Sequence, residues 1–411
     1  MKNTFFLILL LIAFFVNPLK VVPQSPPKSD AYVLLVSFDA FRWDYLDRGI
    51  TPNLDKLIKK GVRAESFRPA FPSKTFPNHL SIITGMYPEN HGIILNKFEN
   101  PYTGEVYRLS DRKEVANPEW YLGEPFWTTA DRNGIKTASF FWPASSMKGK
   151  WHHPDIFKRY NKSVNYESRV DTIAAWLQMP QKERPHFYTL YYSLTDTYGH
   201  RYGPESKEVN YAIARLDTVT GYLIKRLKEI NMFDSLNIII VSDHGMTDIS
   251  PERVINIENI LKGHKVKYQS SGPVMMISTR NEDDVVYNIL KKNENHYKVY
   301  KKSEMPDYYF FDSNPFISDI ILVADLGWSL VDNHSVKSFV GKDAMKGNHG
   351  YDKDALDMHG IFIAEGPAFK SGFRTGTIWN IDVYPLLCKI FNISPRSNID
   401  GKISRIDFIL R

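Results

Sequence analysis

Cysteine is nearly absent from this chain, because Cys388 is the only one among its 411 residues. The chain therefore forms no internal disulfide bond, and a metal site would have to use imidazole and carboxylate groups rather than thiolates. Cys388 itself lies in the apolar run VYPLLCKIF, where a thiol is expected to pack as a small hydrophobic side chain.

Long basic runs, internal repeats and low-complexity tracts are also missing. The formal charge is only +6, from 52 basic and 46 acidic residues spread along the chain, and no nucleic-acid module is visible. This argues against polymer binding by a dedicated nucleic-acid domain. With 43% hydrophobic and 24% charged residues, the composition is that of an ordinary globular protein with a large core.

The sequence has no apolar run long enough to predict a stable membrane span. Its longest run, residues 5–16 (FFLILLLIAFFV), follows Lys2 and has the length of a signal-peptide core, whereas a spanning helix needs about 20 apolar residues. We predict a signal peptide over 1–23, a linker over 24–30 and a catalytic domain over 31–411. No cysteine lies near the end of the run, which argues against a bacterial lipoprotein. Export without disulfides favours the periplasm, with secretion as the other expected destination.

Alternating strand and helix patterns predict an α/β fold. Residues 51–60 begin with Thr-Pro and read as a helix, and residues 209–230 space apolar side chains three and four apart. The segment 257–346 breaks this pattern and is expected to form a small α+β insertion. Four short apolar runs are expected to form buried parallel strands with helices on both faces of the sheet: 32–38 (YVLLVSF), 187–194 (FYTLYYSL), 237–242 (NIIIVS) and 360–364 (GIFIA).

Acidic residues follow three of these runs, and histidines lie near two of the acids. Ligands of open α/β sheets bind beyond the carboxyl ends of the strands, although any single aspartate there can also be a helix cap. Imidazole and carboxylate ligands suit Zn²⁺, and Mn²⁺ or Fe²⁺ would accept the same set. Six such residues divide into two sites of three, enough for two metal ions: Asp39, Asp196, His200, Asp243, His244 and His359.

A hydroxyl nucleophile is the next requirement, and residues 71–78 (FPSKTFPN) offer two. Thr75 and Ser73 both lie where a loop enters a helix, and the positive end of a helix dipole lowers the pKa of a hydroxyl there. From the local residues alone, an ordinary helix cap is the favoured interpretation of Thr75. The local residues therefore leave the cap, Thr75 and Ser73 open.

The motifs taken together resemble the nucleotide pyrophosphatase/phosphodiesterase family of the alkaline phosphatase superfamily, as a bacterial-type catalytic module. The resemblance runs from about residue 33 to 385 and keeps the order of the motifs. It implies a three-layer α/β/α sandwich of alkaline phosphatase type. The motifs that carry it are FDAFRWDYL, FPSKTFPNHLSIITGMYPENHGI, NPEWYLGEPFW, DTYGHRYGP, SDHGM and MHG.

The resemblance implies a role for each residue of the site. Two Zn²⁺ per chain are expected, one held by Asp196, His200 and His359, the other by Asp39, Thr75, Asp243 and His244. Thr75 would be the nucleophile that forms a phospho-threonine intermediate, and Asn96 would bind the phosphate. His79 and His91 have no place in this scheme and are expected to support it.

The expected substrates are nucleotides. The ring of Phe76, directly after Thr75, is placed to form one wall of a binding site, and the resemblance adds Tyr160 and Tyr191 as residues that sandwich a base. Nucleoside triphosphates, dinucleotides and nucleotide sugars would then be cut to nucleoside 5′-monophosphates. Three alternatives remain: a choline or lysophospholipid phosphodiesterase, a phosphomonoesterase, and an exported nucleotide-binding protein without activity. The sequence leaves open the physiological substrate, the base preference, the oligomeric state, and whether the signal segment is cleaved or retained as an anchor.

Overall fold

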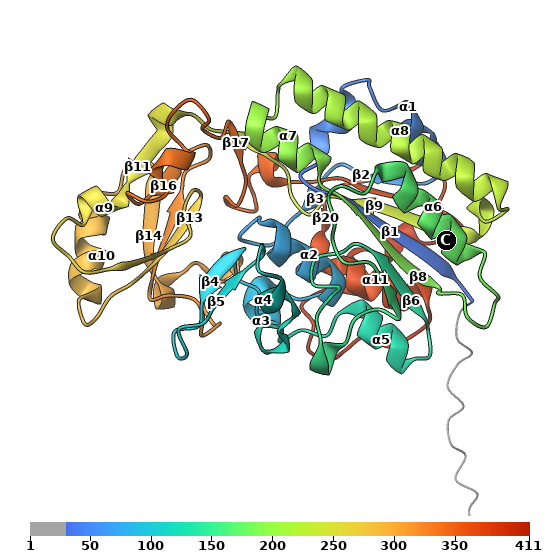
Figure 1. Ribbon diagram of the computed structural model, residues 1–411, viewed down its shortest axis with the longest axis horizontal. Helices are drawn as coiled ribbons and strands as arrows, with labels where there is room; N and C mark the ends of the chain where they lie inside the picture. The colour runs from blue at the N-terminus through green and yellow to red at the C-terminus, as the bar shows by residue number, and fades with distance from the viewer. Residues whose placement is uncertain (1–29) are drawn as a thin grey trace, which may run out of the picture.

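The computed structural model describes residues 30–411, so the predicted signal peptide and nearly all of the predicted linker lie outside the described residues. Its centre is a mixed sheet of eight strands, in the order β19-β2-β18-β9-β1-β8-β6-β7 (Figure 1). The strands are β1 (Tyr32–Phe38), β2 (Val62–Ala64), β6 (Thr137–Phe140), β7 (Ile156–Phe157), β8 (Phe187–Tyr192), β9 (Leu236–Val241), β18 (Phe362–Glu365) and β19 (Phe373–Thr375).

Side chains of the central strand alternate between two hydrophobic cores. Val33 and Leu35 of β1 belong to the core on one face, and Leu34 and Val36 to the core on the other. Because both faces are apolar, both must be covered by helices, and Figure 1 shows helices on either side. The prediction of three α/β/α layers is confirmed. The covering helices are α1 (Pro52–Lys60), α6 (Tyr166–Leu177) and α8 (Lys207–Glu229) on one face, and α2 (Thr75–Thr84), α5 (Phe126–Arg132) and α11 (Val383–Ile390) on the other.

One predicted strand runs in the other direction. Strands β8 and β9 pair with β1 in parallel, as predicted, but β18 pairs antiparallel with β9 and with β2. The reason is the connection: Thr247 pairs with Asn348, so the chain returns to the sheet at the edge where β9 ended. From that edge β18 has to run against β9. An apolar run by itself carries no signal for strand direction.

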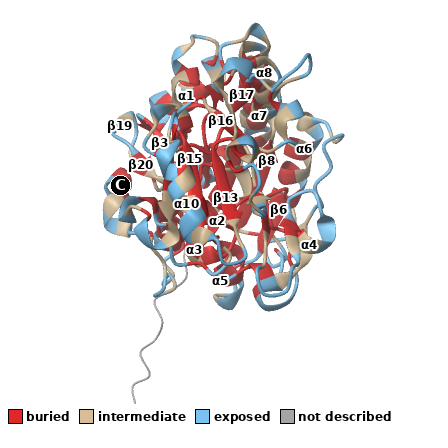
Figure 2. Cartoon of the chain, turned by 90° about the vertical axis from the view of Figure 1, so that its left-hand side faces the viewer, coloured by how far each residue is buried: buried red, intermediate tan, exposed pale blue. Residues whose placement is uncertain are grey.

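The segment between β9 and β18 contains a second, smaller sheet. Its four strands are antiparallel, in the order β12-β13-β15-β14, and a separate hydrophobic core lies beneath them. Figure 1 places this sheet beside the main sheet, and Figure 2 shows α10 exposed on its outer side with buried strands behind it. The elements are β12 (Lys267–Gln269), β13 (Val274–Ser278), β14 (Tyr297–Lys301), β15 (Ile320–Ala324), α9 (Ile257–Ile260) and α10 (Asp283–Lys292), with β11 (Val254–Asn256) paired to β16 (Ser329–Val331).

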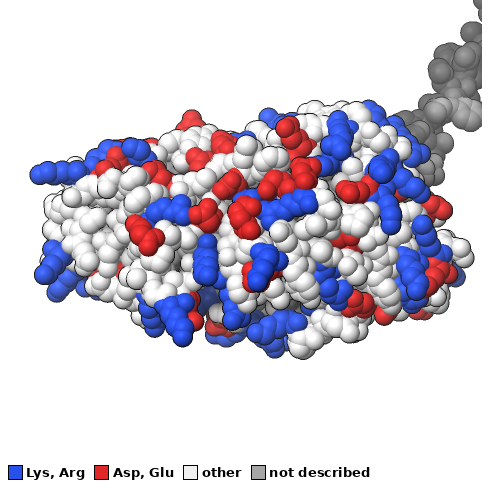
Figure 3. Space-filling model, turned by 90° about the horizontal axis from the view of Figure 1, so that it is seen from above, with Lys and Arg blue, Asp and Glu red and all other residues white. Residues whose placement is uncertain are grey.

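Shorter elements connect the two sheets and frame the site. They are β3 (Phe67–Arg68), β4 (Lys97–Glu99), β5 (Val106–Arg108), β10 (Thr247–Asp248), β17 (Gly347–Asn348), β20 (Ile378–Trp379), α3 (Pro88–His91), α4 (Arg112–Ala116) and α7 (Leu194–Tyr202). Basic and acidic side chains are interspersed on the face drawn in Figure 3. None of the helices in residues 30–411 has the length and apolarity needed to cross a membrane.

Candidate active site

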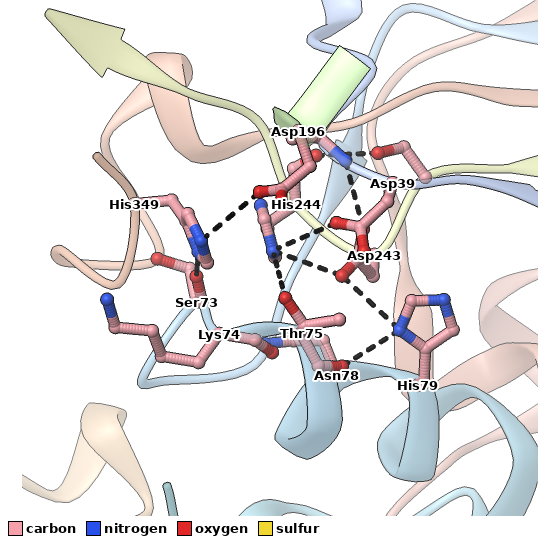
Figure 4. A network of polar contacts seen from close by, with 12 residues as sticks. Asp39, Ser73, Lys74, Thr75, Asn78, His79, Asp196, Asp243, His244 and His349 are labelled. Atoms are coloured by element: carbon pink, nitrogen blue, oxygen red, sulfur yellow. Dashed lines mark hydrogen bonds and ion pairs between the residues drawn. The ribbon is translucent and has the colours of Figure 1, made fainter. Parts of the chain in front are cut away.

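Three aspartates meet at one edge of the main sheet, beyond the carboxyl ends of β1, β8 and β9 (Figure 4). Asp39 follows β1, Asp196 lies in the first turn of α7 after β8, and Asp243 follows β9. The three strands are neighbours and parallel, so they deliver their following residues to the same place. Each aspartate keeps one buried carboxylate oxygen without a hydrogen-bond partner: Asp39 Oδ1, Asp196 Oδ1 and Asp243 Oδ2.

The three carboxylates are in different electrostatic situations. Burial, together with the charges of Asp243 and Asp196, raises the pKa of Asp39 well above its usual value. Burial acts in the same direction on Asp243, but the imidazoles of His244 and His79 outweigh it and lower the pKa of Asp243. Asp39 therefore lacks the positive charge that would stabilise its ionised form, which is what a bound cation supplies.

Three histidines present the same nitrogen to this cluster: His200 on α7, His244 after β9, and His349 after β17. In each ring Nδ1 lies against a backbone carbonyl oxygen, which can only accept a hydrogen bond. Nδ1 is therefore the protonated nitrogen, and the lone pair of the neutral ring is on Nε2. The three carbonyls belong, in the same order, to Gly347, Gly245 and Ser73, at 2.9, 2.8 and 2.9 Å.

The three Nε2 atoms point at the aspartates. Nε2 of His200 lies 3.2 Å from Asp196 Oδ1, and Nε2 of His349 lies 3.5 Å from the same oxygen. Nε2 of His244 lies 3.0 Å from Asp243 Oδ2. Backbone carbonyls commonly fix a metal-ligating histidine in this way, with the other ring nitrogen left for the metal.

Two groups of residues at this edge have the spacing to hold a cation. One is Asp39, Asp243 and His244, and the other is Asp196, His244 and His349; within each group the ligand atoms all lie within 4.8 Å of one another. His200 approaches the second group through its contact with Asp196. Unpartnered carboxylate oxygens, Nε2 lone pairs and the absence of thiolate fit zinc or a similar divalent metal.

His359 does not belong to this cluster, and the prediction for it needs correction. Its Nδ1 lies 2.8 Å from Ser66 Oγ and its Nε2 lies 3.0 Å from the carbonyl oxygen of Lys353. Both ring nitrogens are therefore used, and no lone pair remains for a metal. His349, which the sequence reasoning missed, lies beside Asp196 instead, with its ring stacked on that of His244 at 3.6 Å between centroids.

The glycine after each histidine explains why the motif around His359 was misleading. A side chain at Gly245 would meet the carbonyl oxygen of Asp357 at 2.1 Å, and one at Gly360 would meet Ser242 at 2.7 Å. The backbone of the MHG motif therefore packs directly against the backbone of the DHG motif, and both positions require glycine. One signal could have separated the two histidines: His359 begins an apolar strand run, whereas His349 is flanked by glycine and asparagine.

Thr75 is the first residue of α2, with Lys74 at the N-cap position and no side-chain cap. Its Oγ1 lies 3.3 Å from Nε2 of His244, so the hydroxyl borders the cluster. The competing hydroxyl of Ser73 is buried between two backbone groups, donating to the carbonyl of Tyr351 at 2.9 Å and accepting from the N–H of Gly350 at 3.1 Å. Only Thr75 therefore offers a hydroxyl free to react.

His79 supports the cluster from beneath. Its Nδ1 lies 2.8 Å from the carbonyl oxygen of Thr75 and 3.3 Å from Asp243 Oδ2, and its Nε2 lies 2.8 Å from Ser37 Oγ. All of these groups except Thr75 are fully buried. The ring thereby links the first turn of α2 to the strand end that carries Asp243 (Figure 4).

A cavity of about 1020 Å³ opens onto the cluster, and every residue predicted to bind substrate lines it. Asn96 accepts a hydrogen bond from the N–H of Phe76 at 3.0 Å through Oδ1, which leaves its NH₂ group as the donor for a ligand. Such a donor suits a phosphate oxygen. Phe76 lines the cavity directly after Thr75.

The two tyrosines lie together on another part of the wall. Their rings are edge to face, 5.9 Å between centroids, so a base cannot lie between Tyr160 and Tyr191 in this arrangement. Tyr160 is 46% exposed and offers its ring to the cavity. The hydroxyl of Tyr191 donates to Asp39 Oδ2 at 2.5 Å, so this residue also holds a carboxylate of the cluster in place.

Known proteins resemble this chain in sequence and in structure. The sequence model of the family described as type I phosphodiesterase / nucleotide pyrophosphatase matches residues 33–352. Human ectonucleotide pyrophosphatase/phosphodiesterase family member 1 is 40% identical over 403 residues, which are 94% of this chain and 42% of that protein. The bis(5′-adenosyl)-triphosphatase of Xenopus laevis is 36% identical over 94% of this chain and 82% of its own length. This chain thus spans less than half the length of the human relative.

Solved structures show the same fold. An inactive form of murine ectonucleotide pyrophosphatase / phosphodiesterase 5 in complex with AMP has a TM-score of 0.87 and 33% identity, covering 93% of this chain and all of that one. The human counterpart has the same TM-score and 36% identity, covering 92% of this chain and all of its own. The predicted fold of alkaline phosphatase type is confirmed by these matches. The chain belongs to the type I phosphodiesterase / nucleotide pyrophosphatase family.

Proposed function

We propose that this chain is an exported hydrolase that cleaves nucleotide phosphodiester and pyrophosphate bonds and releases nucleoside 5′-monophosphates. The observation that carries the proposal is the position of the Thr75 hydroxyl, at the start of α2 and beside two groups of metal-binding residues. Support also comes from the relatives, one of which is described as a bis(5′-adenosyl)-triphosphatase and another of which binds AMP.

Two divalent metal ions, zinc in our proposal, would be held at this edge. Asp39, Asp243 and His244, with Thr75, would hold one ion, and Asp196, His200 and His349 would hold the other. Bound ions there would lower the pKa of the Thr75 hydroxyl and of the hydrolytic water, and would neutralise charge on the phosphoryl oxygens and the leaving oxygen.

The chain's own residues would carry the reaction through two displacements. Thr75 Oγ attacks phosphorus and loses its proton, the bond from phosphorus to the leaving oxygen breaks, and a phospho-threonine ester forms. Water then attacks the same phosphorus, which restores the Thr75 hydroxyl and releases the nucleoside 5′-monophosphate. The NH₂ group of Asn96 and the positive end of α2 stabilise the negative charge that develops on the phosphoryl oxygens.

The retained nucleoside would lie in the cavity beside the reaction centre. Its base would contact the ring of Phe76 on one side and the exposed ring of Tyr160 on the other. Aromatic stacking contributes about 1–3 kcal/mol per base and accepts any base. Nucleoside triphosphates, dinucleotides and nucleotide sugars all share this half and are the proposed substrates.

The test compares wild type with Thr75→Ala, each with its zinc content measured, on thymidine 5′-monophosphate p-nitrophenyl ester and on p-nitrophenyl phosphate. We expect about two zinc ions per wild-type chain, a strong preference for the diester, and a folded variant without activity. Preference for the monoester would make the protein a phosphatase. A variant with full activity would exclude Thr75 as the nucleophile, and a wild type that binds nucleotide without turnover would be a binding protein.

Export to the periplasm, or secretion, belongs to the same proposal and is supported by the apolar run at 5–16 and the single cysteine. Expression of the full chain followed by fractionation and determination of the N-terminal residue tests it. Processing near residue 23 and recovery outside the cytoplasm are expected, and an unprocessed cytoplasmic protein would contradict it.

A further inference from the structure

Basic side chains outnumber acidic ones in the lining of the cavity next to the candidate active site, and we call these basic residues the basic wall. Two acidic residues line the cavity, Asp39 and Asp196, and both belong to the groups that would hold metal. The basic residues on its wall are all exposed, and none of them has a role in the proposed chemistry. They are Arg112, Lys113, Lys148, Lys158 and Arg159.

Most of these cations lack an acidic partner. Within residues 30–411, the side chains of Arg112, Lys148, Lys158 and Arg159 make no ion pair and no hydrogen bond. Lys113 has only a contact of 3.7 Å with its neighbour Glu114. Uncompensated cations around a concave site raise the local concentration of anionic ligands and favour those with more negative charge.

The backbone that carries these side chains is fixed to the fold. Lys158 directly follows β7 at the edge of the main sheet, and its N–H donates to the carbonyl of Ser139 at 3.0 Å. Lys148 donates its N–H to the carbonyl of Ala116 at 3.2 Å. The backbone positions of Lys148 and Lys158 are therefore fixed beside the cavity, which their exposed side chains line.

The position of Lys158 and Arg159 along the chain indicates which half of a substrate these two side chains face. Lys158 and Arg159 directly precede Tyr160, whose exposed ring is the proposed contact of the retained base. Because they adjoin Tyr160 in the chain and line the same cavity, we infer that their charges face the nucleoside rather than the phosphate beside Thr75. The cavity volume of about 1020 Å³ is at the upper end for ligand sites and leaves room for a substituted nucleoside.

We propose that the basic wall, Lys158 and Arg159 above all, selects pyrophosphate substrates whose retained nucleoside carries a further phosphate on its ribose. This inference rests on the proposed function and narrows its substrate class. One water molecule hydrolyses the pyrophosphate bond of such a substrate. The products are a nucleoside bisphosphate and the phosphate monoester of the other half. The ribose phosphate itself is not cleaved and serves only for recognition.

Two substrate pairs test the proposal, because the members of each differ by a single ribose phosphate: NADP⁺ against NAD⁺, and coenzyme A against 3′-dephospho-coenzyme A. We expect kcat/KM to be about tenfold higher for the phosphorylated member at low salt, and the ratio to fall as ionic strength rises. In Lys158→Glu/Arg159→Glu the ratio should fall to about one or below.

The matched control is Lys182→Glu/Lys389→Glu, which reverses two exposed charges outside the cavity and should keep the wild-type ratio. Equal kcat/KM within both pairs, or a preference that survives the Lys158/Arg159 reversal, would overturn the proposal.

Equilibrium binding separates this inference from the proposed function. Thr75→Ala should bind adenosine 3′,5′-bisphosphate about tenfold more tightly than AMP, a difference that does not depend on turnover. Equal affinities would refute the selection even in an active enzyme. Failure of wild type to hydrolyse the thymidine diester would refute the proposed function, and a retained affinity difference would then still support the basic wall as a bisphosphate site.

Discussion

The main sheet and the smaller sheet between β9 and β18 both have central strands buried on two faces, but they differ in strand direction. In the main sheet, β1, β8 and β9 are parallel and buried on both faces, and polar side chains collect where they end. In the smaller sheet the strands are antiparallel; β13 and β15 pack one face on the core that includes α10 and the other face on the core shared with the main sheet. Among the described residues, both groups with metal-ligand spacing lie at the edge of the main sheet.

The contrast shows that strand direction decides where functional side chains gather. Parallel neighbours bring the ends of several strands to one edge, whereas antiparallel neighbours send successive ends to opposite edges. The smaller sheet still matters for the site, because the chain that leaves it pairs through β17 with β10 and so delivers His349 beside Asp196.

The largest expected effect separates the two histidines that follow the smaller sheet. His349→Ala should lose bound metal and reduce kcat/KM by at least about 100-fold, because its Nε2 lies in the cluster. His359→Gln should keep its bound metal and lose less than about threefold in kcat/KM, because both ring nitrogens of His359 are occupied by Ser66 and Lys353. Metal analysis and kinetics on both variants make the comparison.

A reversed outcome, with metal lost in His359→Gln and kept in His349→Ala, would restore the sequence-based assignment. It would also mean that the end of the smaller sheet contributes nothing to the site.

An intermediate effect concerns pH and distinguishes a structural histidine from a ligand. Burial lowers the pKa of His359 to about 4, whereas the unfolded residue titrates near 6.5. Below pH 6.5 the unfolded chain therefore binds a proton at His359 that the folded chain does not bind. The contribution of neutral His359 to the free energy of unfolding is present above pH 6.5 and is lost as pH falls through 4. At pH 5 the loss is about 2 kcal/mol.

Urea unfolding of metal-free wild type and His359→Gln, each at pH 7.5 and pH 5, measures this contribution. The fall in unfolding free energy between the two pH values should be about 2 kcal/mol smaller in the variant. Equal falls would show that His359 is protonated in the folded state at pH 5.

The smallest expected effect lies where the two regions meet. Glu89 Oε2 accepts hydrogen bonds from the N–H groups of Asp312 and Ser313 at 2.8 and 3.0 Å. Glu89→Ala should remove the acceptor of these two donors and lower the local opening free energy of residues 311–314 by about 0.5–1.5 kcal/mol, with kcat unchanged. Hydrogen exchange measures the opening, and Glu105→Ala, at an exposed position, is the control. Unchanged protection would indicate that apolar packing alone joins the regions.

Much of the fold could be predicted because its signals are local. The runs that became β1, β8 and β9 are apolar on both faces, and no other arrangement covers them as well as a layered α/β sheet. Strand β18 was expected in the right place but in the wrong direction, since direction depends on where the preceding connection enters the sheet.

The residues of the candidate site also differ in whether a local sequence signal predicts them. Asp39, Asp196 and Asp243 could be predicted because each lies directly after a recognisable strand. His349 could not be predicted, because it reaches the site through the short β10–β17 pairing, and no hydrophobic pattern in the sequence predicts that pairing. His359 was mistaken for a ligand because a His-Gly pair serves close backbone packing as well as metal binding.

By itself the sequence determined the layered α/β architecture, the residue types available for metal binding, and the position of Thr75 at the start of a helix, since these follow from hydrophobic periodicity, composition and capping within short windows. Tertiary structure alone decided the direction of β18, the exchange of His359 for His349, and the gathering around one cavity of cations that mostly lack an acidic partner. The physical reason is that these three features depend on contacts between residues far apart in the chain. The hydrogen-bond and charge partners of such residues are determined only when the chain packs.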